Sequence, residues 1–136
     1  MNHINYFSDY KMNNWNNLDD NRLDDVDTGF LKGNMFKNLY DPYKNFNVPR
    51  ITPKNDLERL MYEIQKYGFA MNDLVLYLDV YPNDDAMVRK FVELQNDYKR
   101  AVSNYENKYG PINLKSTLLD KTPWAWQKNW PFEVKR

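Results

Sequence analysis

The sequence contains no cysteine, one histidine and four glycines, and each scarcity excludes a class of site. Without cysteine there is no disulfide framework, thiolate metal site or cysteine nucleophile. The single histidine is His3, so the Glu-x-x-His pairs of helical di-metal sites cannot form. No Gly-rich phosphate loop, nucleophile elbow or zinc pattern occurs. We therefore expect no enzymatic activity, no catalytic residue, no metal and no other cofactor.

Long apolar runs and an excess of either charge are also missing. No stretch approaches the roughly 20 apolar residues of a membrane span, and the N-terminus is polar, so we expect a protein made and kept in a cytosol. The 19 basic and 19 acidic residues cancel, which favours neither nucleic acid nor a membrane as partner. A zero net charge also removes the electrostatic self-repulsion that keeps copies apart, so the sequence is compatible with a homo-oligomer.

The first 54 residues lack a sustained apolar period. Residues 1–28 are rich in Asn and Asp, and we expect them to form a largely disordered tail. Residues 29–54 combine aromatic residues with three prolines, which indicates an extended segment with one helical turn near Met35 to Tyr40. We expect this segment to bind a partner through one aliphatic and three aromatic residues: Leu39, Tyr40, Tyr43 and Phe46.

A helix is predicted over about 55–80, with Asn55 as its N-cap. Its apolar residues step by four and three, which is the heptad pattern of a packed helix: Leu57, Met61, Ile64, Gly68, Met71, Val75 and Leu78. Leu60, Tyr67 and Leu74 widen this stripe, so the helix is expected to contact more than one neighbour. Asp73 and Asp79 are expected on its surface, since six residues place them about 9 Å apart along the axis.

A second helix is predicted over about 83–109, capped by Asn83 and stopped by Gly110-Pro111. Its apolar residues repeat the same steps: Met87, Phe91, Leu94, Tyr98, Ala101 and Tyr105. Two helices of about 25 residues joined by a short turn must lie antiparallel. Gly68 lets a ring such as that of Tyr98 or Tyr105 approach the backbone, or it marks a local kink.

The C-terminal tail carries three of the four tryptophans. A lone hairpin buries too little apolar surface to be stable, so a third layer is needed, and this Trp/Pro-rich strap is the candidate. The strap either packs on its own hairpin or docks on another chain through its aromatic residues: Trp124, Trp126, Trp130 and Phe132. The alternative is a stacking surface for carbohydrate or single-stranded nucleic acid. The predicted fold is all-α: an antiparallel two-helix hairpin in residues 55–136, with a C-terminal strap and a largely disordered N-terminal region.

Four blocks of residues 57–133 resemble the CotJB family of bacterial spore coat proteins. They are Gly68-Phe69-Ala70 with Asp73-Leu74-Val75-Leu76-Tyr77-Leu78-Asp79, then Tyr81-Pro82-Asn83-Asp84, then Tyr105-Glu106-Asn107-Lys108-Tyr109-Gly110-Pro111, then Pro123-Trp124-Ala125-Trp126 with Trp130-Pro131-Phe132-Glu133. Two segments depart from the family pattern: Val80-Tyr81-Pro82 replaces Thr-His-Pro, and Trp130-Pro131-Phe132 replaces Trp-Pro-Trp. Residues 29–46 are more loosely similar to the small CotJA coat proteins through Leu39-Tyr40-Asp41-Pro42-Tyr43.

The resemblance implies a structural or assembly component of the inner spore coat, made in the mother-cell cytoplasm. It further implies other coat proteins as partners, in particular the manganese-catalase-like CotJC protein, to which the metal and the peroxide chemistry would belong. Peroxide-driven cross-linking of tyrosines such as Tyr6, Tyr10, Tyr40 and Tyr43 is a further hypothesis.

Overall fold

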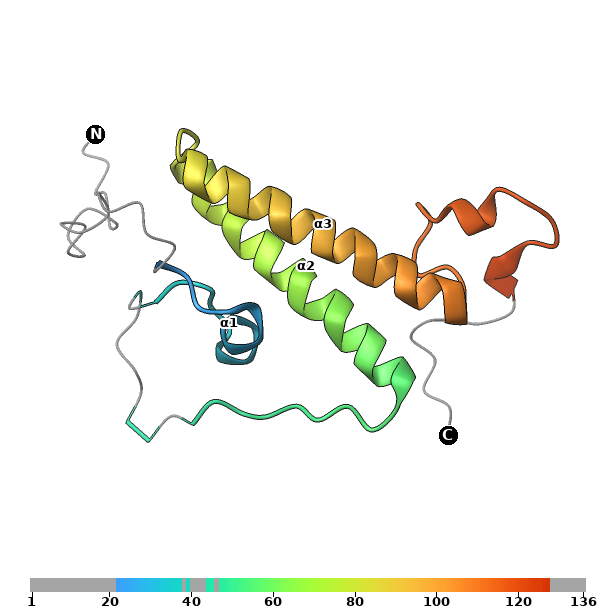
Figure 1. Ribbon diagram of the computed structural model, residues 1–136, viewed down its shortest axis with the longest axis horizontal. Coiled ribbons are helices and arrows are strands. Elements are labelled where there is room, and N and C mark those ends of the chain that lie inside the picture. Colours follow the sequence, from blue (N-terminus) through green and yellow to red (C-terminus); the bar gives the residue numbers. More distant parts are fainter. Residues whose placement is uncertain (1–21, 38, 40–43, 46, 128–136) are drawn as a thin grey trace, which may run out of the picture.

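The computed structural model describes residues 22–37, 39, 44–45 and 47–127. Within these residues the fold is all-α, as predicted: the helices are α1 (Val26–Lys32), α2 (Asp56–Val80) and α3 (Asp85–Tyr109), and no strand forms. Two short 3₁₀ helices follow, at Thr117–Leu119 and Ala125–Gln127. Figure 1 shows α2 and α3 side by side along the long axis, with α1 against α2.

The two long helices form the predicted antiparallel hairpin, and their ends fall within two residues of expectation. Asn55 caps α2 by accepting a hydrogen bond from the Glu58 N–H at 2.9 Å. The cap of α3 is Asp84 rather than the predicted Asn83, because the Asp84 carboxylate accepts the Met87 N–H at 3.1 Å. Gly110 ends α3 with a φ of +97°, a backbone conformation that glycine adopts without strain.

The apolar stripe predicted for α3 is its core face. Met87, Leu94, Ala101 and Tyr105 are buried, with Phe91 and Tyr98 partly buried among them. Of the two explanations for Gly68, the structure has the close aromatic approach: a Cβ built there would lie 3.4 Å from Cε2 of Tyr98.

The stripe predicted for α2 is only half right. Leu57 and Val75 are 37% and 40% exposed, whereas Leu60 and Leu74, which were expected to widen the stripe, are among the most buried residues together with Ala70. The reason is that α2 contacts α3 on one side and α1 on the other. Ala70 and Leu74 belong to a core cluster that also contains Met35 and Phe36, whereas Leu60 packs with Ala101 and Tyr105 of α3.

The third layer comes from the N-terminal side of the chain, not from the tryptophan tail. Residues 22–37, hereafter the N-terminal module, place Leu23, Met35 and Phe36 in one core cluster with Ala70, Leu74, Met87 and Leu94. Residues 22–28 were expected to belong to the disordered tail, and the helical turn was expected near Met35; the helix instead begins at Val26. Asp25 caps it and Gly33 ends it with a φ of +83°.

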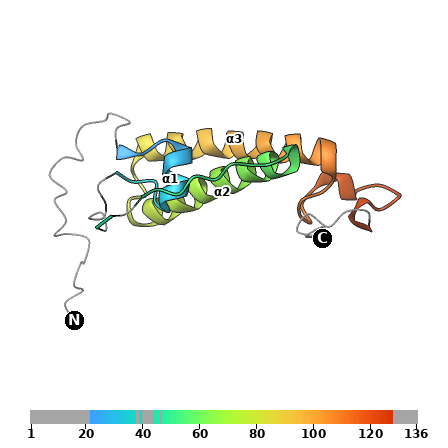
Figure 2. The same cartoon turned by 90° about the horizontal axis from the view of Figure 1, so that it is seen from below.

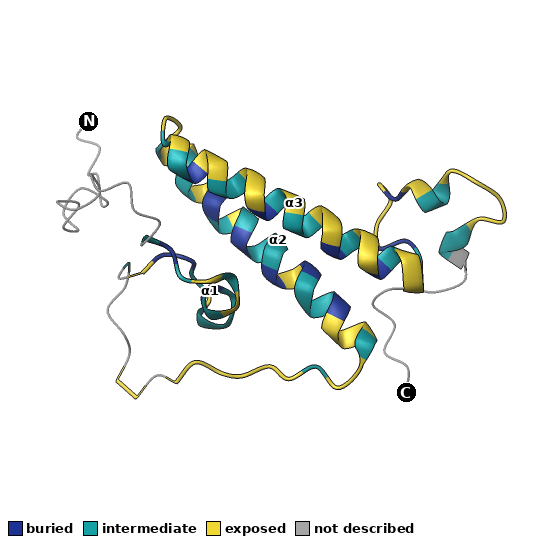
Figure 3. Cartoon of the chain, in the orientation of Figure 1, coloured by how far each residue is buried: buried dark blue, intermediate teal, exposed yellow. Residues whose placement is uncertain are grey.

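The C-terminal segment lies at the opposite end of the hairpin from α1, as both views show (Figures 1 and 2). Its first residues close that end: Ile112 is buried in a second cluster with Leu60, Ile64, Ala101 and Tyr105, and its N–H donates to Glu106 at 3.0 Å. Up to Gln127 the segment forms no layer across the hairpin, so a strap packed on its own hairpin is not shown in the described residues, and docking on another chain stays a prediction. Figure 3 shows the buried residues concentrated where α2 meets its neighbours.

Candidate interaction surfaces

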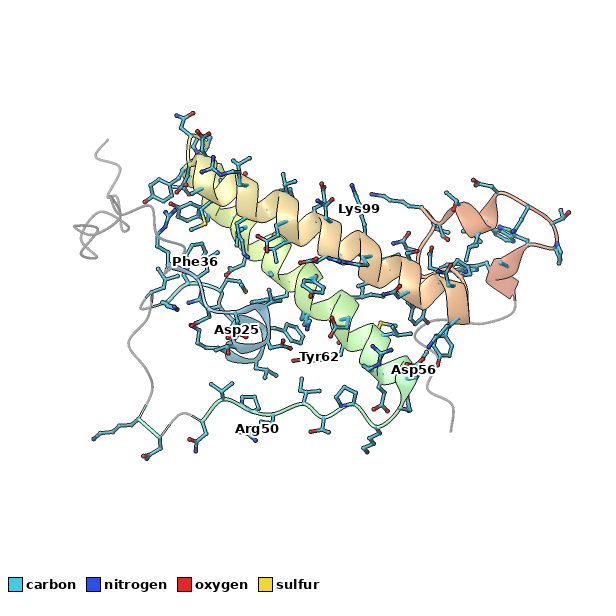
Figure 4. All side chains as sticks on the ribbon, in the orientation of Figure 1. Asp25, Phe36, Arg50, Asp56, Tyr62 and Lys99 are labelled. Atoms are coloured by element: carbon cyan, nitrogen blue, oxygen red, sulfur yellow. The ribbon has the colours of Figure 1, made fainter. Side chains whose placement is uncertain are left out.

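Aromatic side chains carry much of the contact between the N-terminal module and α2. Phe36 stacks on Tyr77 with ring centroids 5.1 Å apart and an angle of 28° between the ring planes. Phe30 meets Tyr62 and Phe69 edge to face, at 5.5 and 5.7 Å. Figure 4 labels Phe36 and Tyr62, which lie on the two sides of α1. Such aromatic pairs add about 0.5–1.5 kcal/mol each beyond the area that they bury.

Met35 is the centre of this contact, since its side chain is fully buried. Its backbone N–H donates to Oδ2 of Asp73 at 2.8 Å. Asp73 was expected to lie on the helix surface without a specific role; in the structure its carboxylate holds the module against α2. Because residue 35 lies 38 positions from residue 73, no local sequence pattern reveals this hydrogen bond.

Three polar side chains join the module to the turn between α2 and α3. Arg22 donates to both carboxylate oxygens of Asp84, at 2.8 and 3.4 Å, and to the Tyr77 hydroxyl at 3.2 Å. The Tyr77 hydroxyl in turn donates to Asp84 at 2.8 Å. The hydrogen bond from Arg22 lowers the pKa of Asp84 to about 2, while burial, aided by Asp84, raises the pKa of Tyr77 to about 12. Asp84 thus caps α3 and binds the module at once.

A second ionic contact lies midway along α2, where Lys66 is buried. Its ammonium group lies 2.9 Å from Glu63, on the same helix, and 3.2 Å from Asp27 of α1. Burial by itself lowers the pKa of Lys66, but the hydrogen bonds to Glu63 and Asp27 outweigh it and the pKa is raised. The side chain also lies over the rings of Tyr62 and Tyr67, at 5.7 and 5.2 Å. The buried charge is therefore paired, which a stable core requires.

Other apolar side chains remain in contact with solvent. The exposed ones are Val75, Leu76 and Val80 of α2, Val88 and Val92 of α3, Val48 and Ile51 before α2, and Leu114 and Trp124 in the C-terminal segment. Residues 51–53 and the first turns of α2, including Leu57 and Met61, line a groove of about 350 Å³. In a monomer such surfaces are candidates for contact with other chains.

Comparison with known families places the chain in a biological context. The model of the family described as CotJB protein matches residues 58–133, more than half of the chain. The chain belongs to the CotJB family. It is therefore a spore coat component, in a family that is generally structural. No curated protein and no solved structure matches the chain.

The matched region covers α2 from residue 58 on, α3 and the C-terminal segment up to residue 133. The N-terminal module lies outside the matched region. It was the main feature that the sequence analysis missed. Three local signals mark its helix: the Asp25 N-cap, Lys32 in the last turn and the Gly33 C-cap.

The predicted partner-binding residues of this CotJB protein fall in different places. Trp124 is 50% exposed, whereas Trp126 is partly buried. Leu39 packs on the core cluster of the N-terminal module, so the structure gives it a core contact. The C-terminal segment that carries Trp124 and Trp126 lies at the opposite end of the hairpin from α1 (Figure 1). The other five lie outside the described residues: Tyr40, Tyr43, Phe46, Trp130 and Phe132.

Across residues 22–37, 39, 44–45 and 47–127, no three His, Cys, Asp or Glu side chains gather in a way that could hold a metal ion. None of the described helices is both long enough and apolar enough to span a membrane.

Proposed function

We propose that this CotJB-family protein is a non-enzymatic adaptor of the inner spore coat, assembled from the mother-cell cytoplasm. Its C-terminal tryptophans bind the manganese-catalase-like coat protein CotJC, and the segment around Leu39 to Phe46 contacts further coat proteins. The metal and the peroxide chemistry belong to the partner. In this account the hairpin is a rigid spacer that carries the two segments.

One observation carries the proposal: Trp124 is 50% exposed, although tryptophan is among the most apolar of large side chains. An indole half in water costs hydrophobic free energy that docking on a partner recovers. Tryptophan is also among the residues that contribute most to binding at protein interfaces. Trp124 lies inside the region that matches the CotJB family, so a family partner is the natural candidate.

The arrangement along the hairpin supports an adaptor rather than a single-partner protein. Leu39 packs on the core cluster of the N-terminal module, whereas the C-terminal segment that carries Trp124 and Trp126 lies at the opposite end of the hairpin from α1 (Figure 1). Each helix of the hairpin has 25 residues and is therefore about 37 Å long. Two partners docked on the two ends would not collide, so one chain would connect two neighbours in a layer.

Affinity capture after co-expression with the CotJC protein of the same organism tests the proposal. We expect wild type to retain CotJC, and the triple variant W124A/W126A/W130A to lose it. The matched control is Leu76→Ala, which removes a side chain that is 59% exposed on α2 outside the tail and should retain CotJC. Far-UV circular dichroism of each variant checks that the hairpin is intact. Equal capture by wild type and the triple variant would rule out the tail as the interface.

A further inference from the structure

Backbone hydrogen bonds within the N-terminal module join its two ends. The N–H of Asp24 donates to the carbonyl of Met35 at 2.8 Å, and the N–H of Lys37 donates to the carbonyl of Arg22 at 2.9 Å. These bonds close residues 22–37 into a loop around α1, with Lys32 and Asp24 forming an ion pair across it. The module is therefore a compact unit that can dock as a whole.

The contacts that hold the module are made with α2 and with Asp84, just before α3. They are the aromatic contacts of Phe30 and Phe36, the Met35–Asp73 hydrogen bond, and the ion pairs Arg22–Asp84 and Lys66–Asp27. None of these contacts depends on the covalent link between module and hairpin. A second copy of the chain presents the same receiving surface, residue for residue.

The segment that connects module and hairpin is longer than the fold needs. Phe36 stacks on Tyr77, near one end of α2, and Asn55 caps the other end. The connecting segment must therefore span the distance from Tyr77 to Asn55, which is 22 residues of helix or about 33 Å. Leu39 still packs on the core cluster, and the 15 residues from 40 to 54 beyond it allow a span of up to about 58 Å between Leu39 and Asn55. Residues 44–45 and 47–52 are exposed, and Figure 1 shows this stretch running back apart from α1.

We propose that copies of this protein exchange their N-terminal modules, so that residues 22–37 of one chain dock on α2 of another. The exchanged contacts are identical to those within one chain, which makes exchange between copies low in cost. A tether of this kind gives the module an effective concentration of order millimolar at its own hairpin. Exchange therefore requires neighbouring copies at a millimolar local concentration, the condition that a packed protein layer would supply. Exchange goes beyond the adaptor function, because it links copies of this chain and does not involve the catalase-like partner.

Isotope mixing tests the exchange directly in the full chain. Heavy-labelled and unlabelled protein are mixed at millimolar concentration, incubated, and treated with a carbodiimide, which joins a carboxylate to an adjacent amine. The Asp27–Lys66 pair, 3.2 Å apart, reports whose module occupies a hairpin. The Asp56–Lys108 pair, 2.9 Å apart within one hairpin, is the internal control.

Exchange predicts heavy–light Asp27–Lys66 peptides whose fraction rises with protein concentration. The Asp56–Lys108 peptides should stay heavy–heavy or light–light throughout. If the Asp27–Lys66 peptides also remain unmixed after incubation at millimolar concentration, the module belongs to its own chain and the proposal is wrong.

A shortened tether provides a second test. Removing residues 42–53 leaves a reach of about 22 Å between Lys37 and Asn55, less than the 33 Å that docking within one chain requires. The shortened chain should form a stable dimer by light scattering with an unchanged helix content. The matched control replaces the same twelve residues with Gly and Ser, keeps the length, and should be monomeric at micromolar concentration. A shortened chain that stays monomeric up to millimolar concentration would overturn the proposal.

Discussion

Replacing Met35 with Ala tests whether the N-terminal module is part of the folded core. The Met35 side chain is fully buried, in one cluster with Leu74 and Leu94 of the hairpin. The substitution removes the side chain beyond Cβ but leaves the backbone N–H free to donate to Asp73. Truncation of a buried Met to Ala costs about 2–5 kcal/mol of stability. Since small domains are stable by about 5–15 kcal/mol, the expected loss of about 3 kcal/mol is a large fraction of the total.

The assay is urea unfolding followed by far-UV circular dichroism, which reports mainly on α2 and α3. Met35 lies outside both helices, so the substitution shifts the unfolding curve of α2 and α3 only if the module and the hairpin unfold together. The matched control is Leu76→Ala on α2, where the side chain is 59% exposed and the expected loss is well under 1 kcal/mol. If Met35→Ala shifts the unfolding midpoint no more than Leu76→Ala does, the module does not stabilise the hairpin and the reasoning is refuted.

Three further predictions concern glycine, tyrosine and tryptophan positions. Gly29→Ala should destabilise the fold by about 1–3 kcal/mol in the same urea titration, because its Cβ would lie 2.4 Å from Sδ and 3.2 Å from Cα of buried Met35. Gly68→Ala should stabilise it by up to about 1 kcal/mol, because its Cβ would make an ordinary contact with the Tyr98 ring at 3.4 Å. Tyr77 stays neutral in the fold up to a pKa of about 12 against an ordinary value of 10.0, so wild type should lose stability as pH rises from 10 to 12. Tyr77→Phe should be less stable at pH 7 but flatter over that alkaline range in pH-dependent unfolding, and an unchanged slope would contradict this. Trp124→Ala should cost under about 1 kcal/mol in thermal unfolding, because the indole is half exposed, while weakening CotJC capture; a loss of 3 kcal/mol would make Trp124 a core residue instead.

The sequence predicted the hairpin well because both long helices carry their own signals. Each has 25 residues, enough for several repeats of an apolar period, and each is bounded by a capping residue or a glycine. The α3 stripe corresponds to its core face because α3 contacts one principal neighbour, α2. The widened stripe of α2 correctly indicated more than one neighbour, but the sequence did not show that the second neighbour is the segment around α1.

The N-terminal module was missed for a physical reason. Its helix α1 has seven residues, too few to show a period, and it follows a run of Asn and Asp that is typical of disorder. Its stability comes from contacts distant in sequence: Arg22 with Asp84, Asp27 with Lys66, and Met35 with Asp73. Pairings 38 to 62 residues apart leave no mark in a single sequence.

Light scattering of the purified chain mixed with its CotJC partner tests the central claim most directly. The account predicts a complex heavier than either protein alone, which dissociates into separate components when Trp124, Trp126 and Trp130 are replaced together by Ala. If the wild-type mixture contains only the two separate proteins, even at concentrations far above those used in the affinity capture, the adaptor function is contradicted.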